Sequence, residues 1–222
     1  MAFTISPKLR AYLDYLPDPT FEDNIPYMYI DTTGNVTVGV GHNLTSHGDC
    51  QLLPFVVQRL TRKAVLGGDQ GRPIGDPKKI GRPATKDEKQ NDYDFLENHD
   101  GLGKYAPEQL ALYTTLELNS SDIDQLFEKD LQDAIAVARN TFSRAFDSYS
   151  VPRQAALIDI AFNCGSFGTM LPLVNAVRGE GLYAKKTSSE RWKAAALHSN
   201  RTAVSAFRNR QIADWLIDGA AD

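Results

Sequence analysis

The sequence predicts an α+β protein, with the strands near the N-terminus and helices filling the C-terminal half. Residues 27–40 are rich in β-forming residues and are interrupted by DTTGN, which indicates a β-hairpin with a tight turn. The C-terminal half instead repeats apolar residues at three-and-four spacing behind capping serines. With 222 residues, of which 42% are hydrophobic, the chain is long enough for one substantial core. We expect one domain, or one core divided between two lobes.

The first predicted element is a short amphipathic helix over residues 6–16. Ser6 suits the cap position and Pro7 the first helical position, and leucines and a tyrosine follow at helical spacing. Pro17 and Pro19 then end the helix. The hairpin comes next, within a segment of about 17–60.

Residues 61–109 are rich in glycine, proline and charged residues and show little periodicity. We interpret them as a loop-rich insertion with little regular structure, of the kind that is often functional. The basic cluster RPIGDPKKIGRP at 72–83 lies inside this segment and is typical of a solvated loop. Whether the insertion covers a cleft, contacts substrate or receives a partner stays open.

Residues 110–222 are predicted to be helical and to pack with the 6–16 helix. Ser121 precedes an apolar stripe through SSDIDQLFEKDLQDAIAVARNTF, and Ser150 and Pro152 begin a second helix that Gly165 is placed to end. Two further helical segments are predicted, ERWKAAALHSN and AFRNRQIADWLIDG.

The amino-acid composition restricts the classes of partner that the chain is expected to bind. The net charge of −4 argues against nucleic acid, because binding to phosphates needs clustered lysine and arginine. No apolar run is long enough to span a membrane, and the first thirty residues lack the pattern of a secretory signal. We therefore expect a monomer made in the cytoplasm without a signal peptide.

Cysteine usage predicts neither a metal centre nor a disulfide framework. Cys50 and Cys164 lie more than a hundred residues apart, so their spacing matches no metal motif. Two free thiols are expected, and one long-range disulfide is the alternative. We expect no metal and no organic cofactor.

Two acids flank the first strand of the predicted hairpin. Glu22 follows the helix stop and Asp31 lies where the hairpin turns, so both fall at ends of elements, where a scaffold often presents chemistry. Two carboxyl groups in different environments are the minimum apparatus for cleaving a glycosidic bond. The alternative is that both are ordinary solvated carboxylates.

The strand after the turn carries Thr37, Gly39 and Gly41 at a spacing of two, which predicts one shared face. Glycine within a strand often marks a close approach of a ligand or of another backbone. That face would suit the wall of a cleft for a sugar chain. His42 is a candidate acid or base, and the alternative is a histidine that packs and forms hydrogen bonds.

Together these residues give E-x8-D-x5-T-x-G-x-G-H, which resembles the motif of the phage-type lysozyme or endolysin family. Later segments resemble the family in the same order, namely DIDQLFEKDLQDAI, RQAALIDIAFNCGSFG, ERWKAAA and NRQIAD. The resemblance covers residues 21–46 and 118–216. Two departures are the Glu22-Asp23 pair, where the family has Glu-Gly, and LPDPT before it.

The resemblance implies a two-lobe lysozyme fold, with a small N-terminal lobe that carries the hairpin and a larger helical lobe. It implies that Glu22 is the general acid, that Asp31 positions and activates water, and that Thr37 holds that water. His42, Gly39 and Gly41 would support this site.

On the helical lobe, the resemblance places Phe162 and Asn163 along the cleft. It pairs an arginine with the catalytic glutamate: Arg210 matches best, and Arg208 is the second candidate. An ordinary surface arginine is the alternative for Arg210.

The implied activity is a muramidase that cleaves the β-1,4 bond between N-acetylmuramic acid and N-acetylglucosamine in peptidoglycan. The family is associated with inversion, for which the two carboxyl groups should be about 6.5 to 9.5 Å apart. One alternative is an inactive peptidoglycan-binding or scaffolding protein with the same fold. Another is a lytic transglycosylase, which would leave anhydromuramoyl ends.

The substrate of such an enzyme is the bacterial cell wall, outside the cytoplasm where the chain is expected to be made. A phage endolysin released through a holin-type lesion and an injected antibacterial effector are both compatible with the sequence. An effector would imply a partner immunity protein. The delivery route and target species stay open.

Overall fold

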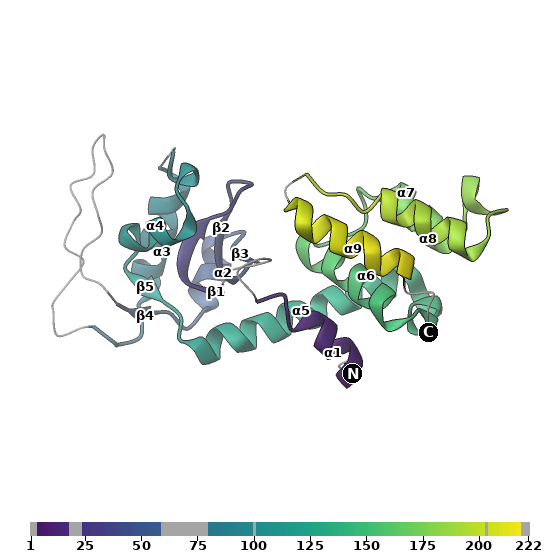
Figure 1. Ribbon diagram of the computed structural model, residues 1–222. Helices are drawn as coiled ribbons and strands as arrows, with labels where there is room; N and C mark the ends of the chain where they lie inside the picture. Colours follow the sequence, from purple (N-terminus) through teal and green to yellow (C-terminus); the bar gives the residue numbers. More distant parts are fainter. Residues whose placement is uncertain (1–3, 18–23, 59–79, 100, 203, 219–222) are drawn as a thin grey trace. The chain divides into compact units, whose positions relative to one another are not determined.

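A computed structural model describes residues 4–17, 24–58, 80–99, 101–202 and 204–218 (Figure 1). The chain divides into two compact units. Unit 1 comprises Met1–Phe21 and Glu128–Asp222, and unit 2 comprises Glu22–Phe127. All strands of the described residues lie in unit 2, and helices fill the rest of the described chain. The prediction of an α+β protein with N-terminal strands is confirmed.

The predicted hairpin is the centre of unit 2. Strands β1 (Asn24–Ile30), β2 (Val36–Val40) and β3 (His42–Asn43) form an antiparallel sheet in the order β1-β2-β3. β1 and β2 pair from Ile30 opposite Val36 to Asn24 opposite Val40, and the register slips between Ile25 and Tyr29. Every residue of β2 is buried, so this strand forms part of the core. A second small sheet pairs β4 (Val56–Val57) with β5 (Leu116–Glu117).

The expectation of little regular structure over 61–109 does not hold for its second half. This half contains α3 (Lys86–Glu97), the 3-10 helix η2 (Leu102–Lys104) and the start of α4 (Pro107–Leu110). At the start of α3, the Thr85 side chain accepts from Glu88 N and the Glu88 side chain accepts from Thr85 N. This capping box supplies a start signal that compensates for the weak periodicity. Residues 61–79, with most of the basic cluster, lie outside the described residues.

Two buried charged residues of α3 hold neighbouring segments of unit 2. The Asp92 carboxylate is fully buried and accepts from Thr115 N at 2.6 Å and Leu116 N at 3.0 Å, where β5 begins. Lys89 Nζ donates to the carbonyl oxygens of Gln51 at 2.9 Å and Leu53 at 2.5 Å. These carbonyls end α2 (His47–Leu52), so α3 is joined to a helix end and to a strand.

Unit 1 is helical. α1 (Pro7–Leu13) and α9 (Ala206–Asp218) both contact α6 (Val151–Cys164), and α8 (Ser188–Leu197) contacts α7 (Leu171–Arg178) and α9. α5 (Ser120–Phe142) begins in unit 2 and continues into unit 1. The remaining short elements are the 3-10 helices η3 (Ala111–Tyr113), η4 (Ser143–Ser148) and η5 (Gly181–Tyr183).

The helix ends follow the sequence signals in most places. Ser6 caps α1 by accepting from Leu9 N at 3.2 Å, as predicted, although α1 ends three residues short of residue 16. Gly165 ends α6 with φ +67°, which confirms its predicted position. Ser150 precedes α6 at the cap position, but its side chain makes no capping hydrogen bond.

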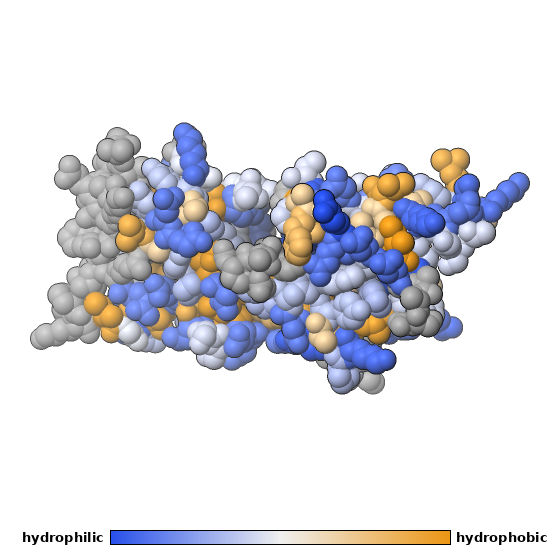
Figure 2. Space-filling model, in the orientation of Figure 1, coloured by the Kyte–Doolittle hydropathy of each residue, from blue (hydrophilic) through white to orange (hydrophobic). Residues whose placement is uncertain are grey.

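Both cysteines are free, as predicted; Cys50 is buried in unit 2 and Cys164 is exposed in unit 1. Burial raises the pKa of the Cys50 thiol to about 12. Within the described ranges, no helix has the length and apolar character needed to cross a membrane. Hydrophobic residues on the face drawn in Figure 2 occur in small groups between hydrophilic ones.

Candidate active site

The expected general acid, Glu22, lies outside the described residues, as do Phe21, Asp23 and Pro19. The described part of the candidate site in unit 2 is therefore the hairpin turn and the strands that follow it. Unit 1 holds the remaining candidates, on α6 and α9.

Asp31 opens the hairpin turn, directly after β1. Its backbone N–H donates to Asn35 O at 2.9 Å, and its carbonyl accepts from Gly34 N at 3.1 Å, which closes the turn. Gly34 has φ +91°, a conformation that glycine adopts readily. The Asp31 side chain is half-buried at this position. The residue is therefore held by the turn that the DTTGN sequence predicted.

The two carboxylate oxygens of Asp31 are used unequally. Oδ1 accepts from Thr33 N at 2.8 Å, Thr33 Oγ1 at 2.8 Å and Asn35 N at 2.9 Å. Oδ2 has one partner among the described residues, Asn35 Nδ2 at 3.4 Å. Asn35 Nδ2 also donates to Thr33 Oγ1 at 2.6 Å, which ties the two partners together. The turn thus fixes the orientation of the carboxylate through Oδ1 and leaves Oδ2 with a long contact.

Thr37 is the next candidate along the chain, and it is buried, with 2% of its surface exposed. Its hydroxyl donates to Asn35 O at 3.3 Å. Since Asn35 in turn donates to Asp31, a hydrogen-bonded chain of three residues runs from β2 into the turn. This chain joins two of the three residues predicted to carry catalysis.

Gly39 and Gly41 both have positive φ, +65° and +72°. A Cβ atom placed on Gly39 would lie 3.3 Å from Ile123 Cγ2 and 3.8 Å from Leu126 Cδ2. The close neighbour of Gly39 is therefore the start of α5. Opposite Thr37 to Gly39, the register slip places the extra residues in β1, between Ile25 and Tyr29.

His42 begins β3, where it pairs with Val38, and it is half-buried. His42 interacts electrostatically with the carboxylate of Asp49. Hydrogen bonds from Thr45 and Ser46 lower the pKa of Asp49, and an electrostatic interaction with His42 contributes in the same direction. His42 is thus placed beside the segment that leads into α2.

In unit 1, Phe162 and Asn163 lie in the last turn of α6, half-buried and exposed respectively. The two arginine candidates on α9 differ in burial. Arg210 is exposed, whereas Arg208 is 2% exposed and its Nε donates to Asp159 Oδ2 at 2.9 Å. Of these two candidates, Arg208 is therefore the buried one, and it is paired with a carboxylate in an electrostatic network.

This network centres on Asp159, which is fully buried and which the sequence analysis did not select. Its Oδ1 accepts from Arg201 Nη1 at 2.9 Å, and its Oδ2 accepts from Arg208 Nε at 2.9 Å. Asn209 holds Arg201 through its Oδ1, which accepts from Arg201 N at 3.2 Å. The available signal was an aspartate inside the apolar run AALIDIAF, where an unpaired charge would be costly.

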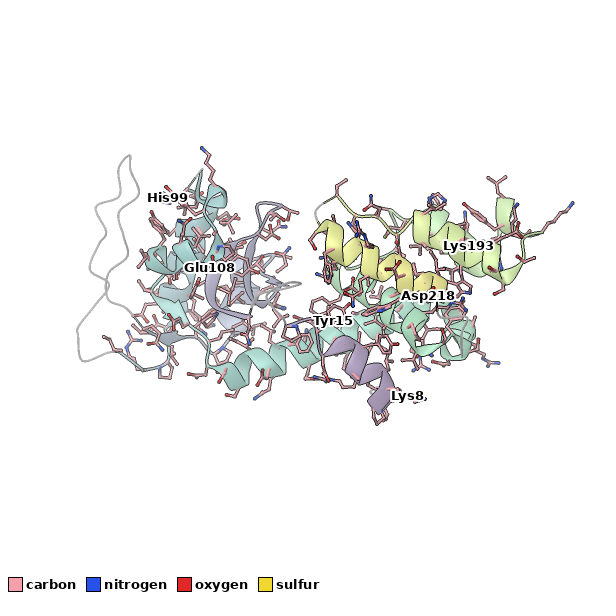
Figure 3. All side chains as sticks on the ribbon, in the orientation of Figure 1. Lys8, Tyr15, His99, Glu108, Lys193 and Asp218 are labelled. Carbon is pink, nitrogen blue, oxygen red and sulfur yellow. The ribbon has the colours of Figure 1, made fainter. Side chains whose placement is uncertain are left out.

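Tyr15, in the turn after α1, completes the network (Figure 3). Its hydroxyl donates to Asp159 Oδ2 at 2.7 Å. Burial raises the pKa of Tyr15, and the negative charge of Asp159 raises it further, so the hydroxyl keeps its proton and remains a donor. The network therefore ties the segment after α1 to α6 and α9.

A comparison of the chain with protein-family models and with curated proteins gives no match. Unit 2 presents a carboxylate oriented by a turn, and unit 1 presents a buried cluster in which two guanidinium groups share one carboxylate. An oriented carboxylate suits the activation of water, and a buried arginine suits the binding of an anion or a carboxyl group.

Proposed function

We propose that the chain is a peptidoglycan hydrolase, a muramidase with a two-lobe lysozyme-like fold. In this proposal Glu22 protonates the leaving oxygen of the glycosidic bond, and Asp31 activates the attacking water. The reaction needs no metal and no organic cofactor, and it inverts the configuration at the anomeric carbon. Support comes first from the E-x8-D-x5-T-x-G-x-G-H spacing in the sequence.

The observation that carries the proposal furthest is the unequal use of the Asp31 oxygens. Three turn hydrogen bonds hold Oδ1, whereas Oδ2 makes one contact with the described residues, at 3.4 Å from Asn35 Nδ2. A general base must be fixed in orientation and must keep one oxygen able to accept a proton from water. Oδ2 of Asp31 meets both needs, and Thr37 supports it through Asn35.

The arginine proposed to accompany the catalytic glutamate is Arg210, with Arg208 as the second candidate. Arg210 is exposed, whereas Arg208 is buried and its guanidinium group is already paired with Asp159. Phe162 and Asn163, at the end of α6, are proposed to contact the glycan.

The proposed site of action is the bacterial cell wall. A phage endolysin and an injected antibacterial effector would both digest this polymer. An effector would be accompanied by an immunity protein that blocks the enzyme.

A second candidate function is peptidoglycan binding without turnover. It is favoured by the same turn, because three short hydrogen bonds to Oδ1 are also what an aspartate with a purely structural role would make. In this alternative, Asp31 shapes the hairpin and activates no water. The two functions differ in whether glycosidic bonds are broken.

The test is digestion of purified sacculi by the wild-type chain and by Glu22→Gln, Asp31→Asn and Asp214→Asn. Asp214 is an exposed carboxylate on α9, so its variant is the matched control. We expect new reducing ends from the wild type and the control, and a loss of at least about a hundredfold in rate for the other two variants. Unaltered circular dichroism spectra would show that the variants are folded.

Three results would contradict the proposal. Sacculi that bind the wild type but release no fragments would favour the binding function. Anhydromuramoyl products would identify a transglycosylase. Full activity of Asp31→Asn would remove Asp31 from catalysis, whatever the products are.

A further inference from the structure

Three side chains with metal-binding atoms meet on the surface of unit 2, away from the hairpin turn. His47 is the first residue of α2, and Asp94 and Glu97 lie in the last turn of α3. One ligand atom from each, an imidazole nitrogen or a carboxylate oxygen, lies within 4.8 Å of the other two. His47 and Asp94 are half-buried and Glu97 is exposed, so the cluster is accessible from solvent.

The positions of the three side chains are set by the packing of α2 against α3. The His47 ring contacts the buried Tyr93 edge to face, with ring centroids 5.1 Å apart, and its Nε2 lies 2.5 Å from Asp94 Oδ1. Tyr93 is itself fixed by donating its hydroxyl to Leu44 O at 3.2 Å. Asp94 and Glu97 are three residues apart on one helix and therefore share a face.

The charges of this cluster call for a cation. The carbonyl end of a helix disfavours negative side chains, and two like charges three residues apart also repel each other. Both conditions hold for Asp94 and Glu97, and the last turn of α3 contains no basic residue. His47 Nε2 lies within hydrogen-bond distance of Asp94 Oδ1, and a cation bound between the two carboxylates would offset their remaining repulsion.

We propose that His47, Asp94 and Glu97 form a binding site for a divalent first-row transition-metal ion, with zinc as the ion that best fits the ligands. One imidazole nitrogen and two carboxylate oxygens are zinc ligands, and the nitrogen selects against magnesium and calcium, which prefer oxygen. A tetrahedral zinc with bonds of about 2.0 to 2.2 Å holds its ligand atoms about 3.3 Å apart. His47 Nε2 and Asp94 Oδ1 are 2.5 Å apart, and all three ligand atoms lie within 4.8 Å of one another, so side-chain rotations would complete the site.

The ion would connect the start of α2 to the end of α3. Three protein ligands leave one tetrahedral position for water or for a group from a partner. The proposal concerns stability and binding and does not depend on the proposed function, because none of the three residues is assigned a role in glycoside cleavage.

The test is a calorimetric titration of the metal-free protein with zinc chloride. The exposed thiol of Cys164 is a competing ligand, so the titration uses Cys164→Ser as the parent chain. We expect one zinc ion per chain, and a loss of affinity of more than about tenfold in Glu97→Gln and in His47→Ala. Magnesium and calcium chloride should give no comparable heat.

Matched controls are Asp87→Asn, an exposed acid in the first turn of α3, and His99→Ala, the histidine two residues beyond the same helix (Figure 3). Both should bind zinc as the parent does. Zinc should also raise the thermal unfolding midpoint of the parent and of the controls, but not that of Glu97→Gln. The absence of saturable binding, or equal affinity in parent and Glu97→Gln, would overturn the proposal.

Discussion

At the scale of single residues, Thr33 and Asn35 decide how Asp31 is oriented. Thr33→Val removes the hydroxyl that donates to Oδ1, and Asn35→Ala removes the amide that contacts Oδ2 and Thr33. Under the proposed function, we expect kcat on soluble glycan fragments to fall by about tenfold with little change in KM, because the base is misoriented while substrate contacts remain.

The conservative variant Thr33→Ser keeps the hydroxyl and should retain most of the activity. Urea denaturation of the same variants measures how much these hydrogen bonds contribute to the free energy of unfolding. For Thr33→Val, we expect a loss of about 1 kcal/mol. A fall in activity that Thr33→Ser does not recover would show that the turn acts by shape and not by the hydrogen bond to Asp31.

Asp159 is a buried charged residue of unit 1 that two arginines contact. Asp159→Asn removes the buried carboxylate that the guanidinium groups of Arg201 and Arg208 both contact. We expect a loss of about 3 to 5 kcal/mol in the free energy of unfolding, because buried cations lose their countercharge. Urea denaturation measures the loss, and the exposed Asp214→Asn should change stability by less than about 0.5 kcal/mol. A loss near that of Asp214→Asn would mean that the arginines do not rely on this carboxylate.

At the scale of elements, the start of α3 makes stability depend on pH. Glu88 accepts from Arg82 Nη1 at 2.8 Å and from Thr85 N at 2.8 Å. The hydrogen bond from Arg82, followed by the bonds from Thr85, lowers the pKa of Glu88 from its ordinary 4.5 to about 2. A carboxyl group with a lowered folded-state pKa stabilises the fold above its unfolded pKa, and this contribution is lost as the pH falls from about 4.5 to about 2.

Glu88→Gln should therefore be less stable than the wild type at neutral pH, by about 1 to 2 kcal/mol, and equally stable near pH 2. Urea denaturation at several pH values gives the two curves, which should converge at low pH. Asp87→Asn, in the same turn of α3, is the control for a general effect of removing one acid. Parallel curves for Glu88→Gln and the wild type would show that the Arg82 pair does not contribute.

The same helix shows where sequence reasoning succeeds and where it fails. The hairpin and α6 were predictable because turn residues, caps and apolar spacing agree there. In α3 the buried positions include Lys89 and Asp92, whose charges are satisfied by carbonyls and N–H groups far along the chain. Apolar periodicity cannot reveal such partners, although the capping box before the helix was readable.

In the candidate site too, features that depend on neighbouring residues could be predicted, and features that depend on distant residues could not. The turn around Asp31 forms hydrogen bonds within five consecutive residues, so its position could be read from DTTGN. The Asp159 network joins residues more than forty positions apart, and the approach of α5 to Gly39 spans more than eighty. A local signal can indicate that Asp159 needs a partner, as its place in an apolar run does, but it does not tell which distant residues supply that partner.

At the scale of the whole molecule, the net charge of −4 sets the response to salt. An acidic enzyme and an anionic cell wall repel each other, and salt screens this repulsion over about 8 Å at physiological ionic strength. Under the proposed function, we expect the initial rate of turbidity loss of sacculi to rise as NaCl increases from about 10 mM to about 150 mM. A falling rate would indicate a positively charged binding face that outweighs the net charge.

The burial of Cys50 gives the protein an internal reporter of its own opening. Its side chain is inaccessible and protonated in the folded state, and it lies against Met28 in the core of unit 2. A thiol reagent added to Cys164→Ser can therefore modify the chain only when unit 2 opens, and the labelling rate counts those openings. The opening of unit 2 can thus be timed in native buffer, without denaturant.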